Sequence, residues 1–96
     1  MKRILEKNKE AVWHTIGGEL VLLNPISGYF FGLNPVAGAF WSLVDGKKSM
    51  EDILDILFKE YDVRLDVLTR DIEEITQKME KNGLLILKTE AENESE

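Results

Sequence analysis

The pattern of apolar and polar positions changes period at an Asn-Pro pair, residues 34 and 35. Before the pair, apolar and aromatic residues occur in short runs that are typical of strands. We predict three strands, at residues 11–16, 19–23 and 29–33. Gly17-Gly18 suits a two-residue hairpin turn, and residues 24–28 favour bends. Strands joined by such short turns predict an antiparallel three-stranded sheet.

After the Asn-Pro pair, apolar residues recur every three or four positions, which indicates helices. Asn34 and Pro35 are typical of the N-cap and the first residue of a helix, and Asp45-Gly46 is typical of a helix end. Ser49 followed by Asp52 resembles a capping box. The sequence therefore predicts a second helix that begins close to residue 50.

A third helix is predicted after Asp66, which we expect to act as its N-cap. It should end at Asn82-Gly83. Its apolar positions form a one-sided stripe of Leu68, Ile72, Ile75 and Met79. Residues 84–87 are too short for another helix, so we expect an extended segment beside the bundle.

A chain of 96 residues suits one compact domain. We assign residues 10–88 to this domain, residues 1–9 to an N-terminal arm, and residues 89–96 to a disordered acidic tail. The predicted fold class is α+β and winged-helix-like: an N-terminal three-stranded antiparallel sheet, a three-helix bundle, and a short extended segment at the C-terminal end.

Composition bears on the location of the chain. Its apolar runs are far shorter than the roughly 20 residues that span a bilayer, and the charged N-terminus is unlike a signal peptide. Cysteine is absent, which is compatible with a reducing compartment. We therefore expect a cytoplasmic protein without a membrane partner.

The formal net charge is −6, and it is unevenly distributed. Residues 1–34 carry four basic and three acidic groups, whereas residues 35–96 carry eight basic and fifteen acidic groups. A winged-helix protein would place its third helix in the DNA major groove. An acidic helical half repels phosphate, so we expect no nucleic-acid partner and keep DNA binding as the alternative function.

The residues that enzymes use for catalysis are scarce. His14 is the single histidine, and it lies in a predicted strand, where a packing or surface role is more common than a catalytic one. Carboxylates fall mainly on predicted solvent-facing helix positions, which argues against a metal site. Gly28, Gly32 and Gly38 lack the spacing of a phosphate-binding loop. We expect no enzymatic activity, no cofactor and no metal.

A binding module remains, and the third predicted strand is its candidate site. An exposed edge strand can accept an extended peptide as an added strand. Residues 29–33 lack the lysine or proline that often protects such an edge, although a covering helix would protect it equally well. A further alternative is an adaptor that docks only on an enzyme surface.

Residues 23–46 resemble the PqqD family, in which a Leu-Asn-Pro stretch continues through a tryptophan to Asp-Gly. In this chain, these features are Leu33-Asn34-Pro35, Trp41 and Asp45-Gly46. The resemblance continues through Glu51-Asp52-Ile53, Tyr61-Asp62-Val63 and Gly83-Leu84-Leu85, and covers about residues 10–87. The ordered set is more specific than any of its parts.

The resemblance implies a winged-helix-like domain without catalytic activity. Such a domain binds the leader of a ribosomally made precursor peptide and delivers it to a maturation enzyme, either a radical SAM enzyme or a leader peptidase and cyclase system. The leader would lie antiparallel to the third strand, beside the third helix. The peptide-binding residues expected on this basis are Tyr29, Phe30, Phe31, Gly32, Leu33, Val67, Asp71, Glu74 and Lys78. The four helix residues represent a choice of one flank over the other, which carries Glu73 and Thr76.

Overall fold

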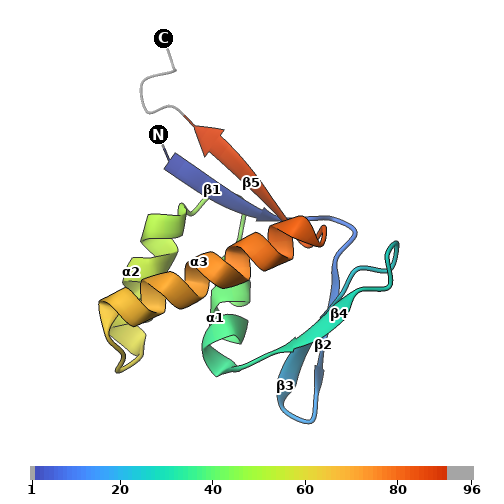
Figure 1. Ribbon diagram of the computed structural model, residues 1–96, viewed down its shortest axis with the longest axis horizontal. Coiled ribbons are helices and arrows are strands. Elements are labelled where there is room, and N and C mark those ends of the chain that lie inside the picture. The colour runs from blue at the N-terminus through green and yellow to red at the C-terminus, as the bar shows by residue number, and fades with distance from the viewer. Residues whose placement is uncertain (1, 91–96) are drawn as a thin grey trace.

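The computed structural model describes residues 2–90. These residues form two small antiparallel sheets around three helices (Figure 1). In chain order the elements are β1 (Lys2–Lys7), β2 (Val12–Ile16), β3 (Glu19–Leu23), β4 (Phe30–Leu33), α1 (Pro35–Leu43), α2 (Met50–Glu60), α3 (Leu65–Lys81) and β5 (Leu85–Glu90). The predicted α+β class, with a three-stranded antiparallel sheet followed by three helices, is confirmed.

The three-stranded sheet has the order β2-β3-β4, so β4 is an edge strand. Cross-strand partners share a face of an antiparallel sheet, and two rows of partners define the two faces here. Trp13, Leu22 and Phe31 form a row on the inner face, where Leu22 is fully buried. Val12, Leu23 and Phe30 form a row on the outer face, where 63% of Phe30 is exposed.

The second sheet corrects the assignment of residues 1–9 to an arm. Residues 2–7 form β1, which pairs with β5 along its whole length and buries Ile4 and Leu5. Residues 84–87 were expected to be extended, and β5 begins within them, at Leu85. It continues through Glu90, so the start of the expected tail at residue 89 is wrong. Residues 91–96 of that tail lie outside the described residues.

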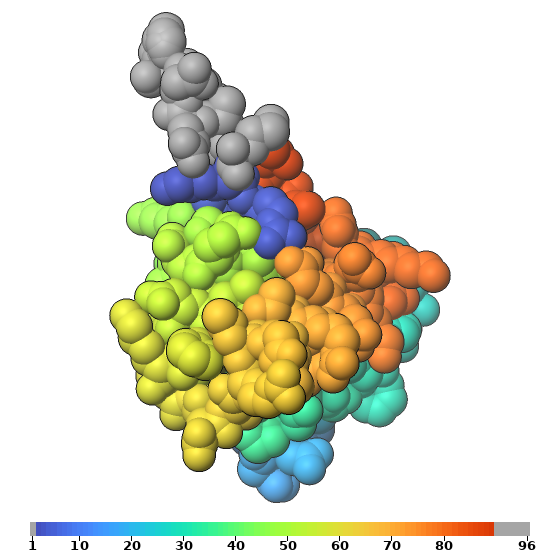
Figure 2. Space-filling view, turned by 60° about the vertical axis from the view of Figure 1, so that its left-hand side comes forward, coloured from blue at the N-terminus to red at the C-terminus, as the bar shows by residue number. Residues whose placement is uncertain are grey.

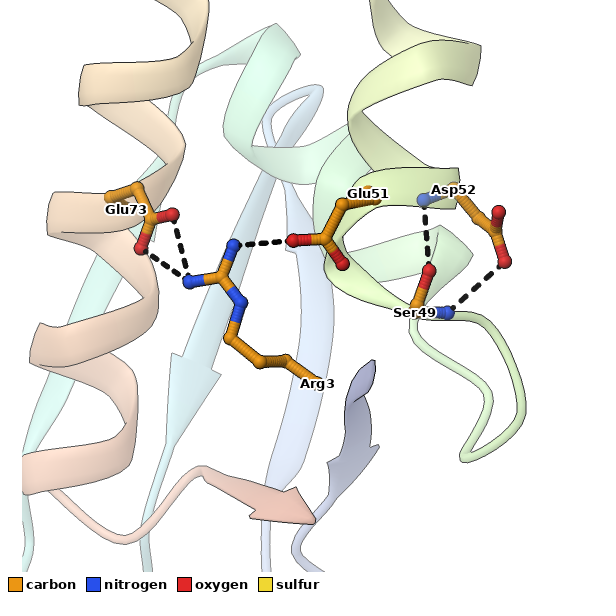
Figure 3. Close-up of polar contacts among 5 residues, drawn as sticks. All are labelled: Arg3, Ser49, Glu51, Asp52 and Glu73. Carbon is orange, nitrogen blue, oxygen red and sulfur yellow. Dashed lines mark hydrogen bonds and ion pairs between the residues drawn. The ribbon is translucent and has the colours of Figure 1, made fainter. Parts of the chain in front are cut away.

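The first two helices begin as their cap residues predict. The Asn34 side chain accepts a hydrogen bond from the backbone N–H of Ala37, with Pro35 as the first helical residue of α1. At the start of α2, Ser49 and Asp52 form a reciprocal capping box (Figure 3). Asp66 is different: α3 begins one residue earlier, and its N-cap, Arg64, makes no side-chain cap bond.

The core lies where the helices meet the inner face of the three-stranded sheet and the side of β1. Helices α2 and α3 lie side by side, with β1 packed next to α2 (Figure 2). The largest side chains with almost no exposure come from every helix and from both sheets: Trp41, Phe40, Leu5, Leu22, Met50, Ile53, Leu57, Ile72, Met79, Leu84 and Val44. The predicted stripe on α3 is buried at Leu68, Ile72 and Met79 and half-buried at Ile75.

Arg3 of β1 connects two helices that are distant in sequence (Figure 3). Its guanidinium donates to the carboxylate of Glu51 in α2 at 2.7 Å and to that of Glu73 in α3 at 2.9 Å. The hydrogen bond with Glu51 raises the pKa of Arg3 and lowers the pKa of Glu51. Glu73 therefore lies on a flank of α3 that contacts β1.

Candidate functional site

The candidate site begins at the free edge of β4. Within residues 2–90, β4 pairs only with β3, and its other edge has no partner strand. The backbone N–H of Asn24 donates to the carbonyl of Tyr29 at 2.8 Å. Hydrogen-bonded and non-hydrogen-bonded pairs alternate along an antiparallel ladder. Phe31 and Leu33, two and four residues after Tyr29, therefore direct their backbone groups toward β3.

The same alternation fixes the backbone groups that point outward. Phe30 and Gly32 direct their N–H and C=O groups toward the free edge of β4. Two donors and two acceptors are thus available to an added strand. Residues 29–33 thus contribute in two ways, with outward-pointing backbone groups at residues 30 and 32 and inward-facing side chains at residues 29, 31 and 33.

The inward-facing side chains next to this edge are aromatic or aliphatic. Tyr29 and Phe31 pack against each other with ring centroids 5.4 Å apart, and both contact the core. Leu33 is buried. Phe30 points to the opposite face of the sheet, as strand alternation predicts, so only its backbone belongs to the free edge.

Helix α3 lies across from the free edge without closing it. No Cα atom of β4 is within 8 Å of a Cα atom of α3. The two elements are connected by Lys78, whose ammonium lies 5.7 Å from the centroid of the Phe31 ring. An added strand would lie about 4.8 Å from β4, closer to it than any Cα atom of α3.

A cleft of about 110 Å³ opens between α1 and α3, beside the end of β4. Val67 and Asp71 line the α3 side of this cleft, and Asn34 lines the side next to β4. The full lining is Asn34, Val36, Ala37, Val63, Val67, Leu68, Asp71, Ile72 and Ile75. Most of these side chains are apolar, so the cleft suits an apolar side chain with a polar group near its rim.

The structure thus brings three of the four α3 residues of the predicted site to the side that faces β4 or the cleft. Glu74 is exposed on the same flank but does not line the cleft. On the other flank, Glu73 binds Arg3 and Thr76 is buried. The charges along the predicted flank run from Asp71 near the end of β4 to Lys78 beside Phe31.

Sequence reasoning missed the other seven cleft residues, namely Asn34, Val36, Ala37, Val63, Leu68, Ile72 and Ile75, the last three of which were predicted only as core positions of the helix. Asn34 was interpreted only as a helix cap, and Val36 and Ala37 only as part of a helix. Their role in the cleft depends on how α1 crosses α3, and no local pattern encodes that crossing. His14 is exposed on β2, and the described residues contain no cluster of three or more potential metal ligands.

A family model described as "Coenzyme PQQ synthesis protein D (PqqD)" matches residues 19–85 of this chain. This match covers more than half of the sequence. The chain belongs to the PqqD family. The matched residues begin with β3 and extend to the first residue of β5, so they contain the free edge of β4, the cleft and α3.

Two solved structures resemble this PqqD-family chain. One is described as "TbiB1 in Complex with the TbiA(beta) Leader Peptide"; it is 30% identical, with a TM-score of 0.73, over 91% of this chain and 99% of that one. The other is "Lasso peptide synthetase B1 complexed with the leader peptide", with 24% identity, a TM-score of 0.73, and coverage of 85% and 96%. A comparison with curated protein sequences found no match. No helix within residues 2–90 is long and apolar enough to cross a membrane.

Proposed function

We propose that this PqqD-family chain is a non-catalytic adaptor for a ribosomally made precursor peptide. It captures the leader segment by strand addition to β4 and presents the peptide to a modifying enzyme. The observation that carries this proposal is the free edge of β4, placed beside an apolar cleft. A similar chain, TbiB1, was solved in complex with a leader peptide, which supports the same use of this fold.

The proposed complex uses the predicted residues in distinct ways. The backbones of Phe30 and Gly32 pair with the leader, while Tyr29, Phe31 and Leu33 face its inward-pointing side chains. On α3, Val67 and Asp71 receive a leader side chain in the cleft. Glu74 and Lys78 contribute charge along the same flank. In an antiparallel complex, the leader runs in the same direction as α3, from Asp71 toward Lys78.

Simple energetics set the expected affinity. Four backbone hydrogen bonds contribute about 4 kcal/mol in total, at about 1 kcal/mol each. Two inward-facing apolar side chains add about 4 kcal/mol if each contributes about 2 kcal/mol on burial. Micromolar binding requires about 8 kcal/mol, and ordering of the peptide opposes it. A leader bound at this site alone should therefore bind no tighter than micromolar.

The partner enzyme is expected to be a radical SAM enzyme or a leader peptidase and cyclase system. We also propose that capture takes place in the cytoplasm, where ribosomal precursors are made, and the absence of cysteine fits that compartment. The charge of α3 argues against the alternative of DNA binding. This helix carries five acidic and three basic residues, and so repels phosphate.

The test is a selection of random displayed peptides of about 12 residues, long enough to span β4 and the cleft. The full chain is immobilised, and Gly32→Pro is the counter-selection target. We expect one family of peptides that binds the wild type and not the variant. The same pattern should occur in the N-terminal part of a short reading frame near the gene for this chain. Selection of no peptide, or of peptides that bind both proteins equally, would overturn the proposal.

A further inference from the structure

Lys78 is the one basic side chain of α3 that the structure places against β4. Its ammonium lies over the Phe31 ring, 5.7 Å from the centroid. No carboxylate among residues 2–89 lies within 4.0 Å of this ammonium, whereas Lys48, Lys59 and Lys88 all have such a partner. Glu74 lies one turn earlier on the same flank, at the i,i+4 spacing that would let its carboxylate compete with a leader carboxylate for the Lys78 ammonium.

The ladder defines which leader residue would meet Lys78. Phe31 directs its backbone groups toward β3, so a leader residue opposite Phe31 forms a non-hydrogen-bonded pair with it. Side chains in such pairs are close together and point to the same face. For Phe31 that is the inner face, where the Lys78 ammonium lies.

We propose that Lys78 is a specificity-determining residue, which selects leaders that carry aspartate or glutamate opposite Phe31. This inference rests on the proposed function. It also implies a spacing. We place the leader residue that enters the cleft opposite Leu33, the neighbour of the cleft residue Asn34. This leader residue is on the same face as the acidic one and two positions earlier in an antiparallel leader. The expected pattern is an apolar residue, any residue, and then an acidic residue.

The overall charge of the chain makes this inference sharper. The net charge of −6 repels acidic peptides at long range. A preference for an acidic residue must therefore come from a local cation, and it should be confined to one position of the leader. The net charge of the chain cannot produce a general preference for acidic peptides, because it repels them.

The test repeats the peptide selection on three full-length proteins. Wild type should enrich acidic residues at a single position, two residues after an apolar one, and Lys78→Glu should enrich lysine or arginine there. Lys47→Glu makes the same change of charge in the loop between α1 and α2, and should keep the acidic preference. Peptides that lose binding to Gly32→Pro but show no charge preference would overturn this inference and leave the proposed function intact.

A second measurement covers the case in which Lys78→Glu disturbs α3. The selected peptide and its acid-to-amide variant are titrated against wild type and Lys78→Gln by fluorescence anisotropy. The amide should weaken wild-type binding about fivefold, a normal size for a partly exposed ion pair, and should change Lys78→Gln binding less than about twofold. Equal losses in both proteins would show that the carboxylate is bound by another group. The selected peptide is one that Gly32→Pro does not bind. If its amide variant binds neither wild type nor Lys78→Gln, the proposed pairing of the acidic residue with Phe31 is contradicted.

Discussion

Replacing Gly32 with proline removes one of the two N–H groups that β4 directs toward its free edge. Within the described residues this N–H has no strand partner, and Gly32 does not adopt a positive φ, so the native sheet should tolerate the change. The variant should therefore fold. An incoming leader, in contrast, meets a missing donor and the proline ring.

The magnitude follows from the hydrogen bond that is lost. One backbone bond contributes about 1 kcal/mol net, and a leader carbonyl left without a donor costs a further 1–3 kcal/mol or so. The dissociation constant should rise by roughly 30-fold or more, corresponding to about 2 kcal/mol. Calorimetric titration with the selected peptide gives this value, and thermal melting followed by circular dichroism reports the fold.

Gly32→Ala is the matched control for this substitution. It keeps the N–H, and an added Cβ would lie 4.0 Å from Oε1 of Glu19, an ordinary contact. Alanine should bind the peptide within about twofold of wild type, because its backbone groups are unchanged. The reasoning is refuted if folded Gly32→Pro binds normally, or if alanine weakens binding as much as proline does.

The remaining predictions concern stability. Arg3→Ala should lower the free energy of unfolding by about 1 kcal/mol in urea titrations, because two part-exposed ion pairs are lost, and an unchanged value would show that they contribute nothing. Contact with Arg3 lowers the pKa of Glu51, so ionised Glu51 stabilises the fold above its unfolded-state pKa, and this stabilisation is lost as the pH falls below about 4.5. The free energy of unfolding should therefore decrease less steeply with falling pH in Arg3→Ala than in wild type. Equal slopes in the two proteins would contradict the assignment of this pH dependence to the pair. Gly83→Ala should destabilise the chain by about 1 kcal/mol or more, since φ is +75° and a Cβ would lie 2.6 Å from Nδ2 of Asn24; a neutral substitution would contradict both the backbone strain and the contact with Asn24.

Local chemistry made much of the fold predictable. The first two helix starts depend on Asn34, Pro35, Ser49 and Asp52, whose side chains act on backbone groups within three residues. The hairpin at Gly17-Gly18 is equally local, and both glycines have positive φ. Features of this kind are written in short segments, so a single sequence reveals them.

Pairing between the chain ends was not predictable in the same way. The β1 segment reads as a charged stretch, and its partner β5 lies some 80 residues away. Only the assembled structure shows that Ile4 and Leu5 are buried there. Arg3 of β1 also binds Glu73, which lies on the flank of α3 opposite to the one that lines the cleft. The choice of flank, which the sequence left open, is thus linked to a strand that it did not reveal.

The central claim is that the free edge of β4 is completed by a foreign peptide, and amide hydrogen exchange tests it most directly. The exchange of individual amides is followed by NMR with and without the selected peptide. We predict new protection at the outward-pointing amides of Phe30 and Gly32, with little change at Phe31 and Leu33, which already face β3. Saturating peptide that leaves the amides of Phe30 and Gly32 exchanging at their free rates would contradict the account.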